Sequence, residues 1–554
     1  MFLPYWRERA WERLAAPVDL LVVGGGITGA GVLHDAALRG LRVALVEQGD
    51  FASGTSSRSS KLIHGGLRYL KRMQLWITRT ACRERDLLSL LDPHLVWGTR
   101  FLYPSYKHDL TPGWQVDLGL TMYDHLTPVR HRHERITAAA ARKAVPQVAR
   151  DGLEFGLLYD DAVADDARLV LAVVEAGLLA GGVALNYARV EELLRNAKGK
   201  VAGAVVRDLE SGATHEIRAA VTVNATGAWC DSVRAMLGNT PARLRPSRGS
   251  HLLFPRHRLP LDLAVTALSA EDGRPVFAVP HPEGTLIGTT DLFHTAALAD
   301  PRPSEDEISY LLRFSQTVFP GARLKRADIS GAFAGVRPIL DSGAESPAEA
   351  SREEEIWEEQ GLLSTAGGKL TTFRATAEEV VDEALKLLPE ARRAVAIAPS
   401  TAAVALPWRV ERGEAAHSLV RTGIDEKVAN GLLRRLGAAA LPLVASSDAK
   451  ELAPVADGLD LCPAELVWHL RAGGVIHLED LLLRRIRMGM WQPQLTLELA
   501  PGLRAVLRRA AGWSVARWNA ELERLAAAVG NWMPPEPALA EAEAPRRRGR
   551  RKAP

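Results

Sequence analysis

The sequence predicts an α/β protein with a separate all-α domain at its C-terminal end, and three observations carry this prediction. The fully apolar run at residues 20–23 leads into a glycine-rich turn, as expected for a central parallel strand that is followed by a helix. A second apolar strand ends at Glu47. Residues 414–529 are almost entirely helical in composition. At 554 residues the chain is also too long for a single core.

The turn after the first strand has the spacing Gly24-x-Gly26-x-x-Gly29, which is typical of dinucleotide-binding proteins. Gly24 makes the tight turn, Gly26 lets the backbone approach a diphosphate at the positive end of the next helix, and Gly29 lets that helix press on the strand. An acidic side chain at Glu47 accepts hydrogen bonds from ribose hydroxyls and repels a 2′-phosphate. The unit therefore favours FAD or NAD over NADP.

Residues 55–70 are rich in hydroxyls and glycines, so we expect a loop that touches a ligand. Hydroxyls can bond diphosphate and ribityl oxygens, and glycines let the chain lie close to a flat ring. From Ser56 the run reads Ser-Ser-Arg-Ser-Ser-Lys-Leu-Ile-His-Gly-Gly-Leu-Arg-Tyr-Leu. This run resembles the second FAD-binding signature of FAD-dependent glycerol-3-phosphate dehydrogenases.

Further motifs that resemble this family follow in the family's order between about Asp19 and Arg374. They are Asp165-Asp-Ala-Arg-Leu-Val170, Val223-Asn-Ala-Thr-Gly-Ala-Trp229, Gly249-Ser-His251, Gly288-Thr-Thr-Asp291, Gly335-Val-Arg-Pro338 and Gly367-Gly-Lys-Leu-Thr-Thr-Phe-Arg374. The resemblance implies a FAD-binding, Rossmann-like domain of the glutathione-reductase or D-amino-acid-oxidase type, with an inserted antiparallel-sheet substrate domain and a C-terminal all-α domain.

The domain boundaries implied by the resemblance divide the chain into four parts. They are an N-terminal extension (1–16), the FAD-binding and substrate (cap) domain (17–397, with cap segments at roughly 85–160 and 245–335), the helical domain (398–533) and a disordered basic tail (534–554). Residues 375–394 form an amphipathic pattern and are expected to be one helix that ends the flavin domain, before a linker at 398–407.

The resemblance implies oxidation of sn-glycerol 3-phosphate to dihydroxyacetone phosphate. The C2 hydroxyl proton goes to a base, the hydride goes to flavin N5, and the electrons pass to a membrane quinone. Such a site needs cations that hold the phosphate, a base near the C2 hydroxyl, and positive charge near the developing alkoxide. Arginine suits phosphate because its planar fork can donate two parallel hydrogen bonds.

The residues that the resemblance assigns to the substrate come from several motifs. Arg68, Tyr69 and Arg352 would hold the phosphate, Lys369 would lie close to both flavin and substrate, and Arg337 and His251 would flank C2. His251 is the preferred base, because an imidazole titrates near neutrality whereas an arginine with a pKa above ~12 does not readily accept a proton. Arg337 then polarises the hydroxyl, and the reverse assignment stays open. The carboxylates that follow Arg352 depart from the family pattern.

The residues expected to bind FAD are spread over the same motifs. They are Gly24, Gly26, Gly29, Glu47, Ser56, Ser57, Lys61, His64, Gly65, Gly66, Val190, Gly227, Asp291, Gly368, Lys369, Leu370 and Thr371. The three cysteines, Cys82, Cys230 and Cys462, lie far apart without metal-ligand spacing. They indicate a reducing compartment, buried apolar roles and no metal site.

The chain shows no sign of a membrane span, because no apolar stretch approaches ~18 residues. Residues 1–15 lack a secretory leader's apolar core and are expected to form a short amphipathic helix. Packing of this helix on the protein is favoured over contact with a membrane surface. The net charge is +3, and residues 546–552 alone carry six of the positive charges. This tail could add ~1 kcal/mol per basic residue near anionic lipid, or simply be solvated. No recognition motif supports nucleic-acid binding.

The resemblance implies a cytoplasmic enzyme attached peripherally to the cytoplasmic membrane face; whether it is a homodimer stays open. Three alternatives also stay open: a glycerol-3-phosphate oxidase that uses O2, a relative that oxidises an amine such as glycine or sarcosine, and a non-catalytic flavin-binding or RNA-associated protein. Several cations suit a phosphate better than a carboxylate. A mere flavin scaffold has no need of Arg68, Arg337 and Lys369 beside a hydroxyl-rich loop.

Overall fold

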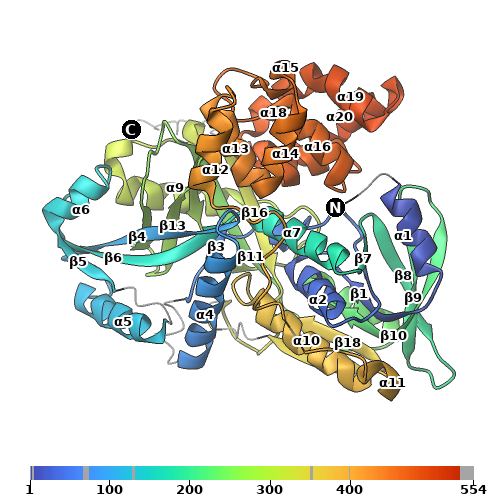
Figure 1. The fold of residues 1–554 in the computed structure, drawn as a ribbon. Coiled ribbons are helices and arrows are strands. Elements are labelled where there is room, and N and C mark those ends of the chain that lie inside the picture. The colour runs from blue at the N-terminus through green and yellow to red at the C-terminus, as the bar shows by residue number, and fades with distance from the viewer. Residues whose placement is uncertain are drawn as a thin grey trace, which may run out of the picture.

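The computed structural model describes residues 2, 5–66, 74–127, 132–347, 349, 354–398 and 400–536. Arg68, Tyr69, Arg352 and the basic end of the tail lie outside the described residues. The described part contains two large sheets and a group of C-terminal helices (Figure 1). The predicted fold class is confirmed by this arrangement.

The first sheet has a parallel centre, in the order β7-β2-β1-β10-β18, with β17 antiparallel at its edge. Its strands are β1 (Val18–Val23), β2 (Val43–Val46), β7 (Val183–Leu185), β10 (Thr214–Asn224), β17 (Glu355–Glu359) and β18 (Leu362–Ala366). Helices α2 (Ile27–Leu38), α7 (Asp166–Leu179) and α10 (Phe373–Leu387) pack together, and their apolar side chains share one core with β1, β2 and β10. The fully apolar strands thus form the predicted Rossmann-like unit.

The antiparallel extension of this sheet, β8 (Ala188–Arg195) and β9 (Val201–Asp208), supports the N-terminal helix α1 (Trp6–Leu14). Arg7 donates to the Asp208 carboxylate at 2.6 Å, and the Trp11 ring stacks on His215 at 4.1 Å. Leu14 is buried in the same core. The first helix therefore packs on the protein, as predicted.

The second sheet has ten strands, most of them in antiparallel pairs. They are β3 (Leu62–Ile63), β4 (Val96–Tyr106), β5 (Glu134–Thr137), β6 (Leu153–Ala164), β11 (Ser247–Pro255), β12 (Ala264–Leu268), β13 (Pro275–Pro280), β14 (Gly284–Gly288), β15 (Leu292–Phe293) and β16 (Gly331–Arg337). Its helices are α4 (Leu75–Leu91), α5 (Gly113–Leu126), α6 (Ala138–Ala144) and α9 (Glu305–Val318). The short helix α8 (Cys230–Arg234) follows β10 of the first sheet and precedes β11. Two chain segments far apart in sequence thus build one sheet.

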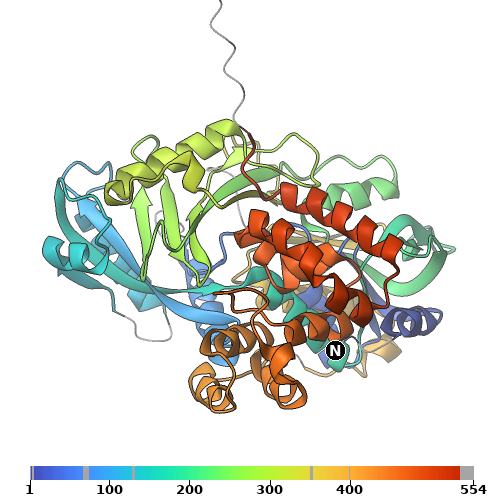
Figure 2. The same ribbon diagram turned by 90° about the horizontal axis from the view of Figure 1, so that it is seen from above.

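The C-terminal helices gather on one side of the molecule (orange to red in Figure 1), and the second sheet extends away from them in Figure 2. They are α12 (Arg412–Val420), α13 (Glu426–Leu436), α14 (Ala440–Ser446), α15 (Ala449–Leu452), α16 (Pro463–Ala472), the π-helical segment η7 (Asp480–Arg485), α17 (Met488–Trp491), α18 (Pro493–Leu499), α19 (Arg504–Ala511) and α20 (Val515–Gly530). Leu253, Leu286 and Phe333 of the second sheet share a core cluster with them.

The single helix predicted at residues 375–394 is wrong in one respect. The structure has α10 and a short α11 (Glu390–Arg393), with Leu388 extended between them. Pro389 causes this break, because a proline disfavours helical geometry in the residue before it. The predicted linker at 398–407 is bound to the flavin domain near its end, because the backbone N–H of Leu406 donates to the Asp92 carboxylate at 2.8 Å.

The three cysteines are all buried, as predicted, and they form no disulfide bond with one another. Across the described ranges, no helix combines the length and apolar character that a bilayer crossing requires. The same residues contain no group of three or more His, Cys, Asp and Glu side chains arranged to hold a metal ion.

Candidate active site

A cavity of about 1,100 Å³ is lined by residues of both sheets. Its floor is the edge where the parallel strands β1, β10 and β18 end. Val23, Asn224 and Ser364 are paired near the carboxyl ends of these strands, and Val23, Ala225 and Ala366 line the cavity there. Ligands of open α/β sheets bind outside this edge. The volume slightly exceeds the ~300–1,000 Å³ of most ligand pockets, so the cavity can hold a cofactor and a small substrate.

The glycine turn has the geometry that the sequence predicts. Gly24 has a φ of +110°, a conformation that side-chain-bearing residues rarely adopt. A Cβ atom at Gly29 would lie 1.9 Å from the carbonyl oxygen of Gly24, so helix α2 can press on β1 only with a glycine there. The Ser56 hydroxyl accepts a hydrogen bond from Ile27 N at 2.9 Å, at the N-terminus of α2. This is the end of a helix that attracts a diphosphate.

Glu47 lies at the end of β2 and lines the cavity. Its carboxylate accepts hydrogen bonds from the backbone N–H groups of Gly25 at 2.6 Å and Gly49 at 2.8 Å. Burial raises the pKa of Glu47 above its ordinary value, and the two backbone donors oppose this rise. Each carboxylate oxygen has a second lone pair, so the fixed side chain can still accept from ribose hydroxyls.

The predicted cofactor residues divide into two groups. Thirteen line the cavity, namely Gly24, Gly26, Glu47, Ser56, His64, Gly66, Val190, Gly227, Asp291, Gly368, Lys369, Leu370 and Thr371. Gly29, Ser57, Lys61 and Gly65 do not. These four support the cavity wall from behind.

The reason is clearest for Lys61 and Gly65. The Lys61 ammonium is buried in an ion pair with Asp166 at 2.6 Å, so it faces away from the cavity. A Cβ atom at Gly65 would lie 2.3 Å from the Cys82 sulfur, so this glycine allows close packing. Gly65 N donates to the Tyr123 hydroxyl at 2.8 Å and leaves no N–H for a ligand.

The residues present fit FAD. The turn and helix end suit a diphosphate, Glu47 suits a ribose, and the hydroxyl-rich loop lies next to both. Gly227 has a φ of +57° and open space where a side chain would stand, so a ligand can approach its backbone. Gly227, Gly368 and Glu47 come from three different strand ends that the parallel sheet brings to one edge.

His251 lies on β11, where it pairs with Gly288 of β14 and Phe333 of β16. Its Nε2 is 2.8 Å from the Ser60 hydroxyl, and its ring stacks on Phe333 at 4.8 Å. A Cβ atom at Gly288 would lie 2.1 Å from the imidazole, so the glycine makes room for the ring. Burial, and then the charges of Arg337 and Lys61, hold the pKa of His251 well below its usual range. His251 is therefore neutral at pH 7.

Arg337 ends β16 and directs its guanidinium into the cavity wall. It donates to the Asp291 carboxylate and to the Thr289 hydroxyl, both at 3.1 Å. A Cβ atom at Gly249 would lie 2.3 Å from the guanidinium, so only glycine at this position leaves the arginine its place. Lys369 follows β18 and lines the same cavity as His251 and Arg337.

Arg58, Ser60 and Thr289 are among the polar residues of this wall that sequence reasoning did not single out. Arg58 is buried, pairs with Asp300 at 3.0 Å, and lies over the Trp532 ring. Ser60 and Arg58 both belong to the hydroxyl-rich loop, so this loop was the available signal. Thr289 precedes Asp291, and its contact with Arg337 depends on strand pairing that the sequence does not reveal.

Comparison with known proteins agrees with this geometry. Residues 19–406 match the family described as FAD dependent oxidoreductase, and residues 401–518 match the C-terminal domain of alpha-glycerophosphate oxidase. The chain is 35% identical over 540 residues to glycerol-3-phosphate dehydrogenase 2 of Mycobacterium tuberculosis, covering 95% of this chain and 90% of the relative. It is 39% identical over 376 residues to aerobic glycerol-3-phosphate dehydrogenase of Staphylococcus epidermidis, covering 67% of this chain and 68% of the relative.

A solved structure matches over nearly the whole length. It is the glycerol-3-phosphate dehydrogenase from Bacillus halodurans complexed with FAD, with a TM-score of 0.79 and 27% identity, covering 98% of this chain and 100% of that one. The match includes the C-terminal helices as well as both sheets. From these similarities and the FAD-compatible cavity, we conclude that the chain belongs to the family of FAD-dependent glycerol-3-phosphate dehydrogenases.

Proposed function

We propose that this protein oxidises sn-glycerol 3-phosphate to dihydroxyacetone phosphate and delivers the electrons to a membrane quinone. The observation that carries the proposal is the make-up of one cavity. Its floor has the dinucleotide-binding turn, and its wall has a neutral histidine, His251, with two cations, Arg337 and Lys369. The relatives with which the chain shares its sequence are glycerol-3-phosphate dehydrogenases, and they suggest the substrate.

The chain's own groups divide the work of the reaction. Bound FAD supplies the oxidant that takes the hydride from C2. His251 accepts the C2 hydroxyl proton at Nε2, and Ser60 can relay this proton because its hydroxyl is bonded to the same nitrogen and lines the cavity. Arg337 stabilises the oxygen as negative charge develops on it, and the Asp291 and Thr289 contacts keep its guanidinium in one orientation.

Phosphate binding is proposed for Arg68, Tyr69 and Arg352, which lie outside the described residues. Within the described part, Lys369 adds a positive charge at the end of β18. A dianionic phosphate needs more than one cation, so the proposal depends on these arginines joining Lys369. Arg68→Lys and Arg352→Lys would then raise KM for the substrate more than they lower kcat.

An exposed apolar surface beside the cavity supports quinone as the acceptor. Helix α5 lines the cavity with Val116, Leu118 and Met122, and the side chains of Trp114 and Leu118 are exposed. Trp76 of the neighbouring helix α4 is 75% exposed. Large exposed apolar side chains are typical of membrane contacts, with tryptophan at the interface. A quinone dissolved in lipid would then meet the cavity wall.

The oxidase that uses O2 is the alternative within this chemistry. Anaerobic addition of sn-glycerol 3-phosphate to the purified yellow protein should bleach the flavin band near ~450 nm. Recovery of the band with a quinone analogue but not with air would support the dehydrogenase. Recovery with air alone would establish the oxidase, and no bleaching of FAD-loaded protein would reject both. His251→Asn should slow the bleaching by about 10²–10⁴-fold.

Membrane attachment is tested separately by flotation with vesicles of anionic phospholipid. Trp76→Ser combined with Trp114→Ser should reduce the bound fraction, because both exposed rings are lost. Leu179→Ser is the matched control, since Leu179 is also well exposed but ends α7, on a different helix from the proposed surface. Equal binding of the double variant and the control would contradict the proposed membrane surface.

A further inference from the structure

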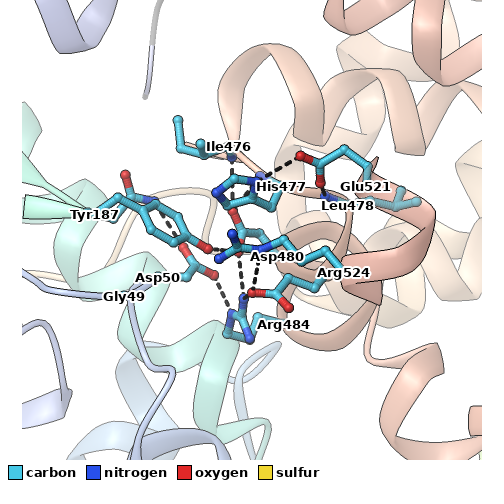
Figure 3. A network of polar contacts seen from close by, with 12 residues as sticks. Gly49, Asp50, Tyr187, Ile476, His477, Leu478, Asp480, Arg484, Glu521 and Arg524 are labelled. Atoms are coloured by element: carbon cyan, nitrogen blue, oxygen red, sulfur yellow. Dashed lines mark hydrogen bonds and ion pairs between the residues drawn. The ribbon is translucent and has the colours of Figure 1, made fainter. Parts of the chain in front are cut away.

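One segment of the C-terminal domain reaches into the FAD-binding domain. Residues Asp480–Arg485 form the π-helical segment η7, and Arg487 follows it with a φ of +70°. All six residues of η7 are buried. Figure 3 shows how Arg484 and Asp480 of this segment meet Asp50 and Tyr187, which come from the FAD-binding domain. The contact surface is therefore polar and charged rather than an apolar packing face.

Asp50 is the first point of contact. Asp50 lies in the loop after β2, three residues beyond Glu47, and its side chain is buried, with 1% of the residue exposed. Arg484 Nε and Arg485 NH1 both donate to Asp50 Oδ2, and Arg485 NH2 donates to Oδ1 at 3.0 Å. Asn186 adds a further hydrogen bond to Oδ1 at 3.1 Å. One carboxylate in the loop of residues 47–50 is thus bound by two arginines from the C-terminal domain.

The arginine that holds Asp50 is itself fixed. Arg484 NH2 donates to Asp480 Oδ1 at 2.6 Å, and the Tyr187 hydroxyl donates to the same oxygen at 2.6 Å. The backbone N–H of Tyr187 donates to the carbonyl oxygen of Gly49 at 2.8 Å. The other Asp480 oxygen accepts the backbone N–H groups of Ile476 and His477 (Figure 3). The 47–50 loop is therefore held from both sides of one network.

The second cofactor loop is held by Arg487, three residues beyond Arg484. Its NH2 donates to the carbonyl oxygen of Ser57 at 3.1 Å and to Asp166 Oδ1 at 2.9 Å. Asp166 also pairs with Lys61 and accepts the Ser59 hydroxyl at 2.7 Å. The same loop carries Ser56 at the helix N-terminus and Ser60 at His251. Three arginines within four positions, Arg484, Arg485 and Arg487, thus supply cations to both loops.

We propose that Arg484, Arg485 and Arg487 are positioning residues for FAD, through which the C-terminal domain sets the affinity for the cofactor. Loss of one arginine removes a donor from a buried carboxylate or carbonyl, and the loop relaxes to recover the lost hydrogen bond elsewhere. Relaxation of residues 47–50 displaces the Glu47 carboxylate, which would contact the ribose of FAD, and the backbone N–H of Gly49, which donates to that carboxylate. The inference depends on the family's FAD site and not on the identity of the substrate.

The experiment uses the full-length protein and the variant Arg485→Gln, with Arg435→Gln as matched control. Arg435 is buried like Arg485 and pairs with the buried Glu465, but this pair lies wholly inside the C-terminal domain. FAD release from the holoenzyme is followed by flavin fluorescence after dilution, and Kd is measured for FAD and for ADP. ADP carries the half of the cofactor that the 47–50 loop would hold.

Arg485→Gln should raise Kd for FAD and for ADP by about the same factor, roughly 10–100-fold, as is typical when groups that orient the direct contacts of a bound ligand are lost. Arg435→Gln should lower the thermal midpoint of the apoprotein similarly but leave both Kd values within about twofold. Equal changes in Kd for the two variants would show a general loss of stability and overturn the proposal.

Two further variants keep the test decisive if Arg485→Gln does not fold. Arg485→Lys keeps a cation near Asp50 but loses the paired donors, so it should raise Kd by a smaller factor than Arg485→Gln. Asp50→Asn keeps the size of the side chain and should raise Kd for ADP. Unchanged ADP binding in both variants would refute the proposal. This conclusion does not depend on whether the variants still turn over sn-glycerol 3-phosphate.

Discussion

Gly249→Ala is expected to disable the enzyme through Arg337 without unfolding it. Gly249 lies on β11, does not have a positive φ, and faces Gly335 of β16. The added methyl group would stand 2.3 Å from Arg337 NH2 and 2.5 Å from the Thr289 hydroxyl. Both are side-chain atoms that can move, so the strand itself need not shift.

The size of the effect follows from the displacement. The guanidinium must move by about 1 Å to reach the 3.4 Å of an ordinary contact, which also strains its bonds to Thr289 and Asp291. A misplacement of ~1 Å at a catalytic group costs about 10²-fold in rate. We therefore expect kcat/KM to fall about 100-fold, which corresponds to ~2.7 kcal/mol of transition-state stabilisation. The thermal midpoint should change little.

The assay is the anaerobic rate of flavin bleaching by sn-glycerol 3-phosphate, with FAD content measured on the same samples. Gly98→Ala is the matched control, because Gly98 lies on β4 of the same sheet and has open space around it. The double variant Gly249→Ala with Arg337→Ala should be no slower than Arg337→Ala alone. Normal kinetics for folded Gly249→Ala, or a further full loss in the double variant, would refute the reasoning.

Three further outcomes follow from the same contacts. Ser60→Ala removes the hydroxyl bonded to His251 and should slow flavin reduction about tenfold, with unchanged FAD affinity; unchanged flavin reduction would argue against a relay. Gly65→Ala would place a methyl group against Cys82, so its free energy of unfolding, measured by urea denaturation, should fall by about 1–3 kcal/mol. Burial opposes protonation of His477, but two carboxylate partners raise its pKa from 6.5 to about 9. Because the folded pKa is raised, this residue should contribute about 1–3 kcal/mol below pH 6.5 and lose it as pH rises through about 9. Thermal midpoints of wild type and His477→Gln should therefore converge above that pH, and a constant difference would contradict the assignment.

The sequence was most informative where function depends on short-range spacing. The turn at Gly24 and the strand end at Glu47 are separated by one strand–helix–strand unit, so their chemistry could be predicted from local patterns. The apolar strand runs and the C-terminal helices were predictable for the same reason. A proline rule already present in the sequence, at Pro389, would also have corrected the helix at 375–394.

The contacts that a residue makes across the fold were not predictable in this way. Lys61 belongs to a motif that was predicted to bind the cofactor, yet its ammonium pairs with Asp166, which is 105 positions away. The Arg485 pair with Asp50 spans 435 positions. Periodicity and composition describe neighbours along the chain, whereas ion pairs of this kind depend on how two domains dock. From the sequence alone, Arg484, Arg485 and Arg487 therefore resemble the basic residues of an ordinary helix end. Their contacts become visible only in the folded structure, where the two domains meet.

The family motifs combine two physical roles that the sequence alone does not separate. In Gly249-Ser-His251 the histidine lines the cavity as the proposed base, whereas Gly249 contributes the space that Arg337 occupies. Gly288 does the same for the imidazole of His251. An alanine at either glycine would leave every catalytic side chain in the sequence and still displace one of them. The catalytic geometry of this site therefore depends as much on what its backbone omits as on the groups that it presents.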